Sequence, residues 1–128
     1  MQTYRGSCQC GNITFEFESE MSTALRCNCS FCTRRGALLH KVSPEQFRLV
    51  KGDVKAPNGA NTYASGIFLH HFCPNCGIQC FTLMEGRGKY SARRININLN
   101  CVEGVDTANL TVRDFDGAAM PKDSTTWE

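Results

Sequence analysis

Nine cysteines lie in this 128-residue chain, and seven of them fall into three short clusters. The clusters span residues 8–10, 27–32 and 73–76. Thiolates at CxC and CxxC spacing can point at one metal ion, and a CxxC step followed by a glycine, here Gly77, is typical of a zinc knuckle. Three such clusters in one short chain predict cysteine-bound zinc.

The number of cysteines in each cluster predicts how the ligands divide. A structural Zn²⁺ takes four protein ligands, whereas a catalytic Zn²⁺ takes three and keeps one open position. The middle cluster has three cysteines and the outer two have a pair each, so the middle cluster with either pair would offer five thiolates, one too many. The simplest division is two Zn²⁺ per chain, one in a closed site and one in an open site. The predicted ligands are Cys8, Cys10, Cys73 and Cys76 for the structural zinc and Cys27, Cys29 and Cys32 for the open, catalytic-type zinc.

Five further candidate ligands lie outside the clusters, namely Cys80, Cys101, His40, His70 and His71. We interpret the two cysteines as small buried residues in strands, as free cysteines often are. The alternative is that one of the five is the fourth ligand of the second zinc, which would close that site and remove the prediction of an enzyme. Because His70 and His71 are neighbours in a predicted strand, they face opposite sides of it, and we expect one to be partly buried and one exposed.

The open site predicts a particular chemistry. Three thiolates make the zinc a poorer Lewis acid than three neutral histidines would, but a fourth thiolate can still bind, because zinc deprotonates a coordinating thiol. A thiol bound there could attack a small aldehyde held nearby. Arg34 and Arg35 follow Cys32 directly, and either could balance the negative charge or bind a substrate carboxylate. The alternative is two solvated arginines on a loop.

Length and composition restrict the class of protein. The chain has the length of one ordinary domain, so we expect a single domain over residues 1–128, with a polar tail over 118–128. The sequence has no apolar run long enough to span a bilayer and its first residues lack the apolar stretch of a secretory signal, so we predict a cytoplasmic protein with no membrane partner. An odd number of cysteines also argues against a disulfide framework.

The net charge does not favour a nucleic-acid partner. The formal charge is +2 with neutral cysteines. Seven thiolate ligands would subtract seven charges and two Zn²⁺ ions would add four, so the sum becomes −1. Lys and Arg are also scattered along the chain, with no long basic run.

Alternating hydrophobic residues predict a mainly β fold. Strict alternation over 12–18 indicates a half-buried strand, and 94–99 repeats it, with its isoleucines and Leu99 inward and with Asn96 and Asn98 outward. Shorter strands are expected at 37–42, 47–50, 67–72, 80–84 and 110–115. Turn residues separate them at 52–53, 57–59, 86–88 and 116–117, and short helical turns are expected after Pro44 and around 106–109.

Four segments, in this order and spacing, resemble the glutathione-dependent formaldehyde-activating enzyme family, also called the centromere-protein-V-like family. They read GSCQCGNITFEFE, LRCNCSFCTRRGA, HHFCPNCGIQCFT and NLNCVEGVD…FDG. The resemblance covers residues 4–117 and implies a zinc-stabilised, Mss4-like fold of several coiled antiparallel sheets. It also implies the division of zinc ligands given above, because all seven cysteines match the family's ligand positions.

The resemblance implies a carbon–sulfur lyase that condenses glutathione with formaldehyde to S-hydroxymethylglutathione. The partners would be a small thiol and a small aldehyde. Because a fold does not determine a function, a second reading is a non-catalytic zinc module that binds a protein partner or carries a small thiol without turnover. The occupant of the fourth position on the second zinc distinguishes the two readings. The edges of a β-sheet would allow an oligomer, but the sequence specifies none.

Overall fold

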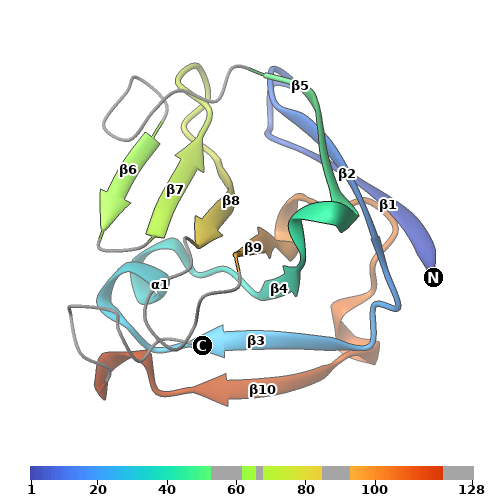
Figure 1. Ribbon diagram of the computed structural model, residues 1–128. Coiled ribbons are helices and arrows are strands. Elements are labelled where there is room, and N and C mark those ends of the chain that lie inside the picture. The colour runs from blue at the N-terminus through green and yellow to red at the C-terminus, as the bar shows by residue number, and fades with distance from the viewer. Residues whose placement is uncertain (53–61, 66–67, 85–92, 120–128) are drawn as a thin grey trace.

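The computed structural model describes residues 1–52, 62–65, 68–84 and 93–119 (Figure 1). The described strands are β1 (Gln2–Ser7), β2 (Thr14–Ser19), β3 (Thr23–Cys27), β4 (Leu39–Val42), β5 (Phe47–Lys51), β6 (Thr62–Ser65), β7 (Phe68–Phe72), β8 (Gln79–Met84), β9 (Arg94–Asn98) and β10 (Thr111–Phe115). One α-helix, α1 (Ser30–Arg35), and the 3₁₀ turns η1 (Pro44–Gln46), η2 (Leu99–Cys101), η3 (Thr107–Asn109) and η4 (Gly117–Ala119) complete the described part. In that part, no helix is long and apolar enough to cross a membrane.

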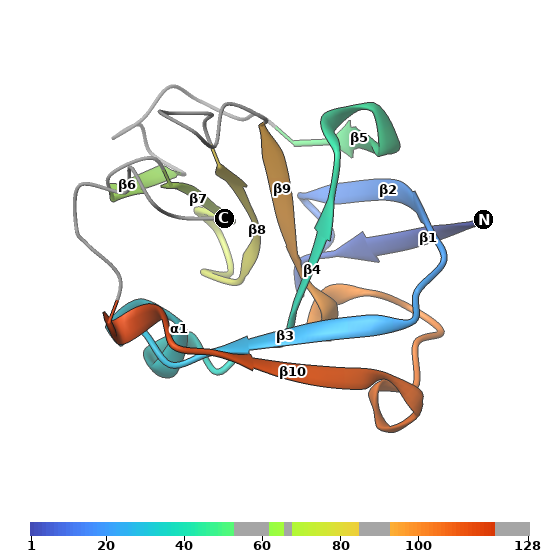
Figure 2. The same cartoon turned by 60° about the horizontal axis from the view of Figure 1, so that its bottom comes forward.

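The strands form two sheets, as the mainly β prediction requires. One sheet has the order β1-β2-β5 and the other has the order β10-β3-β4-β9-β8-β7-β6. Figure 2 shows the larger sheet curling, so that β6 and β7 stand well away from the flat pair of β3 and β10. Among the described strands, neighbours are antiparallel apart from β3 and β10, which are parallel. Apart from this one parallel pair, the described sheets are antiparallel, as the resemblance implied.

The hydrophobic core lies between the two sheets. Phe15 and Phe17 of β2 are fully buried, as the alternation predicts, and the Phe15 ring packs edge-on against Phe81 of β8 at 5.8 Å between centroids. Burying a phenylalanine side chain contributes roughly 1.5–3 kcal/mol. The segment after η2 packs closely on β1, so that Gly6 has no room for a side chain: a Cβ there would lie 2.9 Å from the Cys101 carbonyl oxygen and overlap the ring of Phe15 on the neighbouring strand.

The opposite face of β7, β8 and β9 is also covered. Alternation correctly puts Asn96 on the face opposite Ile95 and Ile97, but the prediction that Asn96 points out to solvent is wrong, because it is only 7% exposed. The prediction that one of His70 and His71 is exposed is also wrong, since both are buried. The reason is that α1 packs over the His70 face of the sheet while His71 contacts Phe81 in the core.

All seven predicted strands are present, with ends shifted by a residue or two. The helical turns predicted near Pro44 and Asp106 are also confirmed, as η1 and η3. Strands β1, β3 and β6 and helix α1 were not predicted. The predicted turns at 57–59 and 86–88 and most of the polar tail lie outside the described residues.

Candidate metal centres and active site

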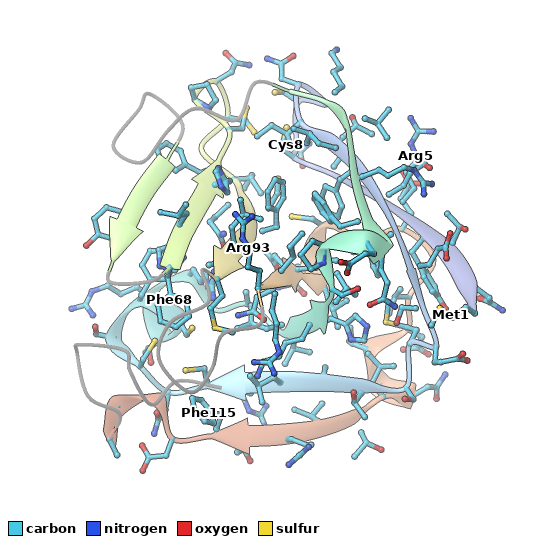
Figure 3. The ribbon with its side chains drawn as sticks, in the orientation of Figure 1. Met1, Arg5, Cys8, Phe68, Arg93 and Phe115 are labelled. Carbon is cyan, nitrogen blue, oxygen red and sulfur yellow. The ribbon has the colours of Figure 1, made fainter. Side chains whose placement is uncertain are left out.

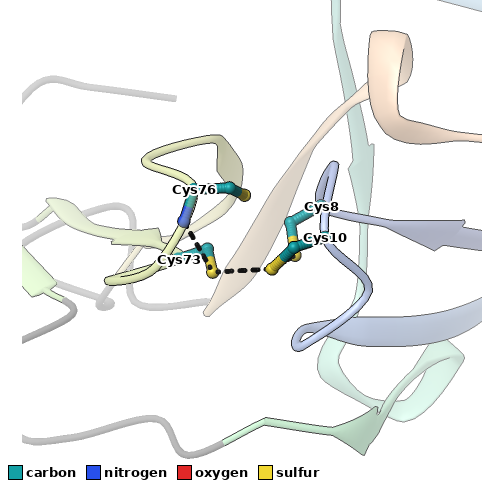
Figure 4. Close-up of side chains that lie close together, drawn as sticks. All are labelled: Cys8, Cys10, Cys73 and Cys76. Atoms are coloured by element: carbon teal, nitrogen blue, oxygen red, sulfur yellow. Dashed lines mark hydrogen bonds between the residues drawn. The ribbon is translucent and has the colours of Figure 1, made fainter.

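Four cysteines meet where the turn after β1 approaches the turn between β7 and β8 (Figure 4). The Sγ atoms of Cys8, Cys10, Cys73 and Cys76 all lie within 4.8 Å of one another. The Cys8–Cys10 Sγ pair is 3.7 Å apart and the Cys10–Cys73 pair is 3.6 Å apart. Thiolates bound tetrahedrally at about 2.3 Å from one Zn²⁺ lie about 3.8 Å from each other. The sulfur spacing therefore fits a zinc ion.

The backbone of these turns favours thiolates. The amide of Ile13 donates to Cys8 Sγ at 3.3 Å, and the amide of Cys76 donates to Cys73 Sγ at 3.4 Å. Backbone N–H groups, first that of Ile78, lower the pKa of Cys76 to about 6. Gly77 has a φ of +79°, which a glycine adopts without strain and which closes the knuckle.

The second cluster lies at the junction of β3 and α1. Cys27 is the last residue of β3, Cys29 is the N-cap of α1, and Cys32 is buried within the helix. Their Sγ atoms lie within 4.8 Å of one another. Cys29 Sγ accepts the amide of Cys32 at 3.4 Å, so one sulfur both begins the helix and faces the cluster.

A hydrogen bond within this cluster shifts the pKa values of Cys27 and Cys32 in opposite directions. A hydrogen bond from the Cys32 thiol lowers the pKa of Cys27 to about 5, in spite of partial burial. The same bond, and burial after it, raises the pKa of Cys32, while the Arg35 charge opposes that rise. Three sulfur donors of this kind fit a thiophilic ion such as Zn²⁺.

Among the described residues, no other cysteine or histidine joins either cluster. Cys80 is completely buried in the core, as predicted, and Cys101 packs against the same core. The hydrogen bond that the Cys80 thiol donates to Cys101, together with burial, raises the pKa of Cys80. His40 lies elsewhere, with its Nε2 2.6 Å from Ser19 Oγ and its Nδ1 2.8 Å from the Thr23 carbonyl oxygen.

The two arginines that follow Cys32 have different surroundings. Arg35 Nη2 donates to Cys32 Sγ at 3.2 Å, and the Arg35 guanidinium carbon lies 4.9 Å from the centre of the Phe31 ring. Arg34 is exposed, and its Nη1 donates to the Ser30 carbonyl of its own helix at 3.0 Å. Of the pair, the structure brings Arg35 to the three-cysteine cluster and turns Arg34 away from it.

Arg35 joins a hydrogen-bond network on the sheet. Arg35 Nη1 donates to Gln79 Oε1 and, at 3.3 Å, to Thr82 Oγ1, and Gln79 Nε2 donates to Thr82 Oγ1 at 3.1 Å. A hydroxyl accepts two hydrogen bonds and donates one. The Thr82 proton is therefore directed to His70 Nδ1, 2.9 Å away, which leaves the His70 proton on Nε2. Burial, then the Arg35 charge, lowers the pKa of His70 to about 3, so this ring is neutral at physiological pH.

Aromatic rings form one wall beside this network. Phe31 of α1 stacks on His70 with 3.9 Å between ring centroids, and Tyr63 of β6 stacks on Phe31 at 6.0 Å. Tyr63 is 52% exposed, so the stack runs from the protein interior to solvent.

A pocket of about 800 Å³ opens beside the three-cysteine cluster. Cys27 and Cys32 line it, together with Leu38 and charged or polar side chains of β3 and β10. At its rim, Arg26 Nε pairs with Asp114 Oδ1 at 2.9 Å. Figure 3 shows Cys8, of the four-cysteine cluster, far from Phe115, which lines this pocket, so the two cysteine clusters are separate centres.

Sequence reasoning missed Gln79, Thr82 and Asn96. Gln79 and Thr82 closely follow the Cys73–Cys76 motif and Asn96 lies further along the chain, but no spacing in the sequence links them to the three-cysteine cluster. Only the strand register, which pairs His70 with Thr82 and Thr82 with Asn96, brings them to the face that α1 covers.

Comparison with known proteins identified a family and similar solved structures. The family model for glutathione-dependent formaldehyde-activating enzyme matches residues 3–109. A crystal structure of a Rhodobacter sphaeroides protein, a Northeast Structural Genomics target, is 26% identical in sequence with a TM-score of 0.63, and the alignment covers 85% of this chain and 99% of that chain. A search of curated proteins gave no match.

Proposed function

The chain belongs to the glutathione-dependent formaldehyde-activating enzyme family, and we propose that it is a zinc-dependent carbon–sulfur lyase acting on adducts of a small thiol and a small aldehyde. Glutathione and formaldehyde are the pair in the family description, and S-hydroxymethylglutathione would be their product. The observation that carries the proposal is the three-cysteine cluster, which gains no fourth cysteine or histidine from the described residues and opens on a pocket.

Cys27, Cys29 and Cys32 would hold the reactive-site metal, and Cys8, Cys10, Cys73 and Cys76 would hold a structural one. When bound by three cysteines, Zn²⁺ supplies a positive charge that lowers the pKa of a substrate thiol. The condensation itself needs no oxidant or reductant. A carbon–sulfur bond forms, the carbonyl π bond breaks, and the thiol proton ends on the former carbonyl oxygen.

The residues around the cluster support this chemistry. Arg35 is held by Gln79 and Thr82 and places a positive charge 3.2 Å from Cys32 Sγ, where it offsets the charge of the thiolates. Phe31 shields one side of the Arg35 guanidinium. A pocket lined by Cys27 and Cys32 opens beside the cluster and leaves room for a small reactant. Because thiols stay reduced in the cytoplasm, the proposal places the protein there.

Exchange spectroscopy with ¹³C-labelled formaldehyde and glutathione tests the proposal directly. We expect zinc-loaded protein to accelerate formation and dissociation of S-hydroxymethylglutathione above the uncatalysed rate. Cys29→Ser should abolish the acceleration, whereas Cys101→Ser, which changes a cysteine outside both clusters, should retain it. If stoichiometric wild-type protein leaves the exchange rate unchanged, the lyase proposal is wrong and a non-catalytic zinc module becomes the better account.

A further inference from the structure

A row of polar side chains crosses the face of the large sheet that α1 covers. His70 of β7 pairs with Thr82 of β8, and Thr82 pairs with Asn96 of β9. Directly paired residues of neighbouring strands project from the same face of a sheet. Arg94, two residues from Asn96 on β9, projects from this face as well. Arg35 reaches the row from α1 through its bond to Thr82.

Three polar atoms around this row are buried without a hydrogen-bond partner. They are Arg35 Nε, Arg94 Nη1 and Asn96 Oδ1. Asn96 is only 7% exposed, so water does not replace the missing partner freely. A buried polar group without a partner typically costs about 1–3 kcal/mol. Such groups are rare in native proteins and call for an explanation, and a bound ligand that supplies the missing hydrogen bonds is one.

Among the described residues, one positive charge on this face also lacks a partner of opposite sign. In the described part of the chain, the salt bridges are Met1–Glu20, Arg26–Asp114 and Arg48–Glu16, and none involves Arg35 or Arg94. Arg35 Nη2 donates to Cys32 Sγ, and Arg35 Nη1 donates to the neutral side-chain oxygens of Gln79 and Thr82. The Arg94 guanidinium, which forms no salt bridge among the described residues, favours an anionic ligand on this partly buried face.

We propose that Asn96 and Arg94, with Arg35 beside them, form a binding site for the carboxylate and amide groups of a peptide-like thiol. Arg94 binds the carboxylate, and Asn96 Oδ1 accepts an amide N–H of the same ligand. Arg35 connects this site to Cys32, so it fixes where the ligand's sulfur lies relative to its anionic end. The substrate class is a thiol with a carboxylate several bonds from its sulfur. This inference rests on the proposed function for the place where the sulfur binds.

Calorimetric titration with S-methylglutathione and its dimethyl ester tests the site without turnover. Neither probe has a free thiol, and the ester lacks the carboxylates but keeps the amides. We expect wild-type protein to bind the acid roughly tenfold more tightly than the ester. Arg94→Met should remove that preference, and Asn96→Leu should weaken both probes by roughly tenfold. Arg113→Met, which removes an exposed arginine of β10, should change neither affinity.

The variant Asn96→Asp keeps the size of the side chain, so it tests the site even if Asn96→Leu does not fold. Its negative charge should reverse the preference, so that the ester binds more tightly than the acid. Equal binding of acid and ester to wild-type protein, no measurable binding of either probe, or a wild-type preference that persists in Arg94→Met would overturn the proposal. Failure of the lyase proposal is distinguishable, since it would abolish formaldehyde exchange and leave these affinities as expected.

Discussion

Arg35 Nη2 lies 3.2 Å from Cys32 Sγ, within one turn of the same helix. The bond makes a guanidinium part of the three-cysteine cluster, and the hydrogen bonds of Arg35 to Gln79 and Thr82 fix it there. Its neighbour Arg34 has the same charge and a similar position in sequence, but among the described residues its side chain bonds to the backbone of α1 alone. Substitutions of Arg35 and Arg34 therefore compare a charge held at the cluster with a charge exposed to solvent.

Replacing Arg35 should impair activity far more than replacing Arg34. We expect Arg35→Met to lower kcat/KM for the thiol by roughly 10- to 100-fold, because a charge-assisted hydrogen bond at the cluster is worth about 1.5–3 kcal/mol. Arg34→Met should change it less than about twofold. Steady-state kinetics with parallel zinc analysis measures both, and equal losses in the two variants would contradict a specific role for Arg35.

The two cysteine clusters should differ in their contribution to stability. Cys76→Ser should lose one zinc per chain and more than about 4 kcal/mol of unfolding free energy, since loss of a structural metal is among the most damaging changes. Cys29→Ser should also lose one zinc but keep most of the stability, because its cluster joins only neighbouring residues. Measurements of zinc content and of urea unfolding in both variants test this difference, with Cys101→Ser as the control. Similar stability losses in Cys76→Ser and Cys29→Ser would refute the division into a structural and a reactive centre.

Burial of His70 should make the protein less stable in mild acid. The pKa of His70 is about 3 in the folded protein, lowered chiefly by burial, and about 6.5 when unfolded. The unfolded state therefore binds more protons between these values, so stability is complete above pH 6.5 and falls as the pH is lowered towards 3. His70 alone should account for about 2 kcal/mol of loss between pH 7.5 and pH 5.

The variant His70→Phe isolates this effect, because a phenyl ring preserves the stacking on Phe31 but does not titrate. Protonation of the cysteine ligands also weakens the protein in acid, and it does so equally in both proteins. Urea unfolding at pH 7.5 and pH 5 with saturating zinc should therefore show a smaller loss in His70→Phe than in wild type. An identical loss would show that His70 is not the titrating group.

The buried Ser19–His40 pair should be structural. His40 Nδ1 faces a carbonyl oxygen and must carry the proton, so Ser19 donates to Nε2 at 2.6 Å, as the serine of a catalytic pair would. Ser19 Oγ, however, is buried and also accepts the amide of Met21, a residue with a φ of +49°. We expect Ser19→Ala to cost about 1–3 kcal/mol and to leave kcat unchanged. Thermal unfolding measures the loss of stability and steady-state kinetics measures kcat, with Ser22→Ala as the exposed control. A large fall in kcat in Ser19→Ala would show that the pair is catalytic and not structural.

Much of the fold follows from local pattern. Phe15 and Phe17 lie on the buried face that alternation assigns, and the cysteines gather into the two groups that ligand counting suggests. Strand β1 was missed because QTYRGS has little hydrophobic alternation and is held by pairing with β2. Helix α1 is too short for a helical period to appear in the sequence.

The errors at the site have one physical cause. Solvent exposure of a strand residue depends on what covers the sheet, and no local pattern reports that. Asn96, His70 and His71 were assigned as if one face of each strand met water, but α1 covers that face through Phe31 and Arg35. The same covering makes a polar network from residues that look like ordinary strand positions.

The spacing of the cysteines has a consequence for biosynthesis. The sulfurs of the reactive centre come from six consecutive residues, 27–32, whereas Cys10 and Cys73 of the other centre are 63 residues apart. A local motif can bind zinc in an unfolded chain, so its metal adds less to folding than a metal that only the folded state can bind. Strand β10, which closes over this motif through the bond from the Asn28 amide to the Phe115 carbonyl, is synthesised much later. We therefore expect the nascent chain to acquire its reactive zinc on the ribosome, long before the strand that finishes the surrounding pocket has been made.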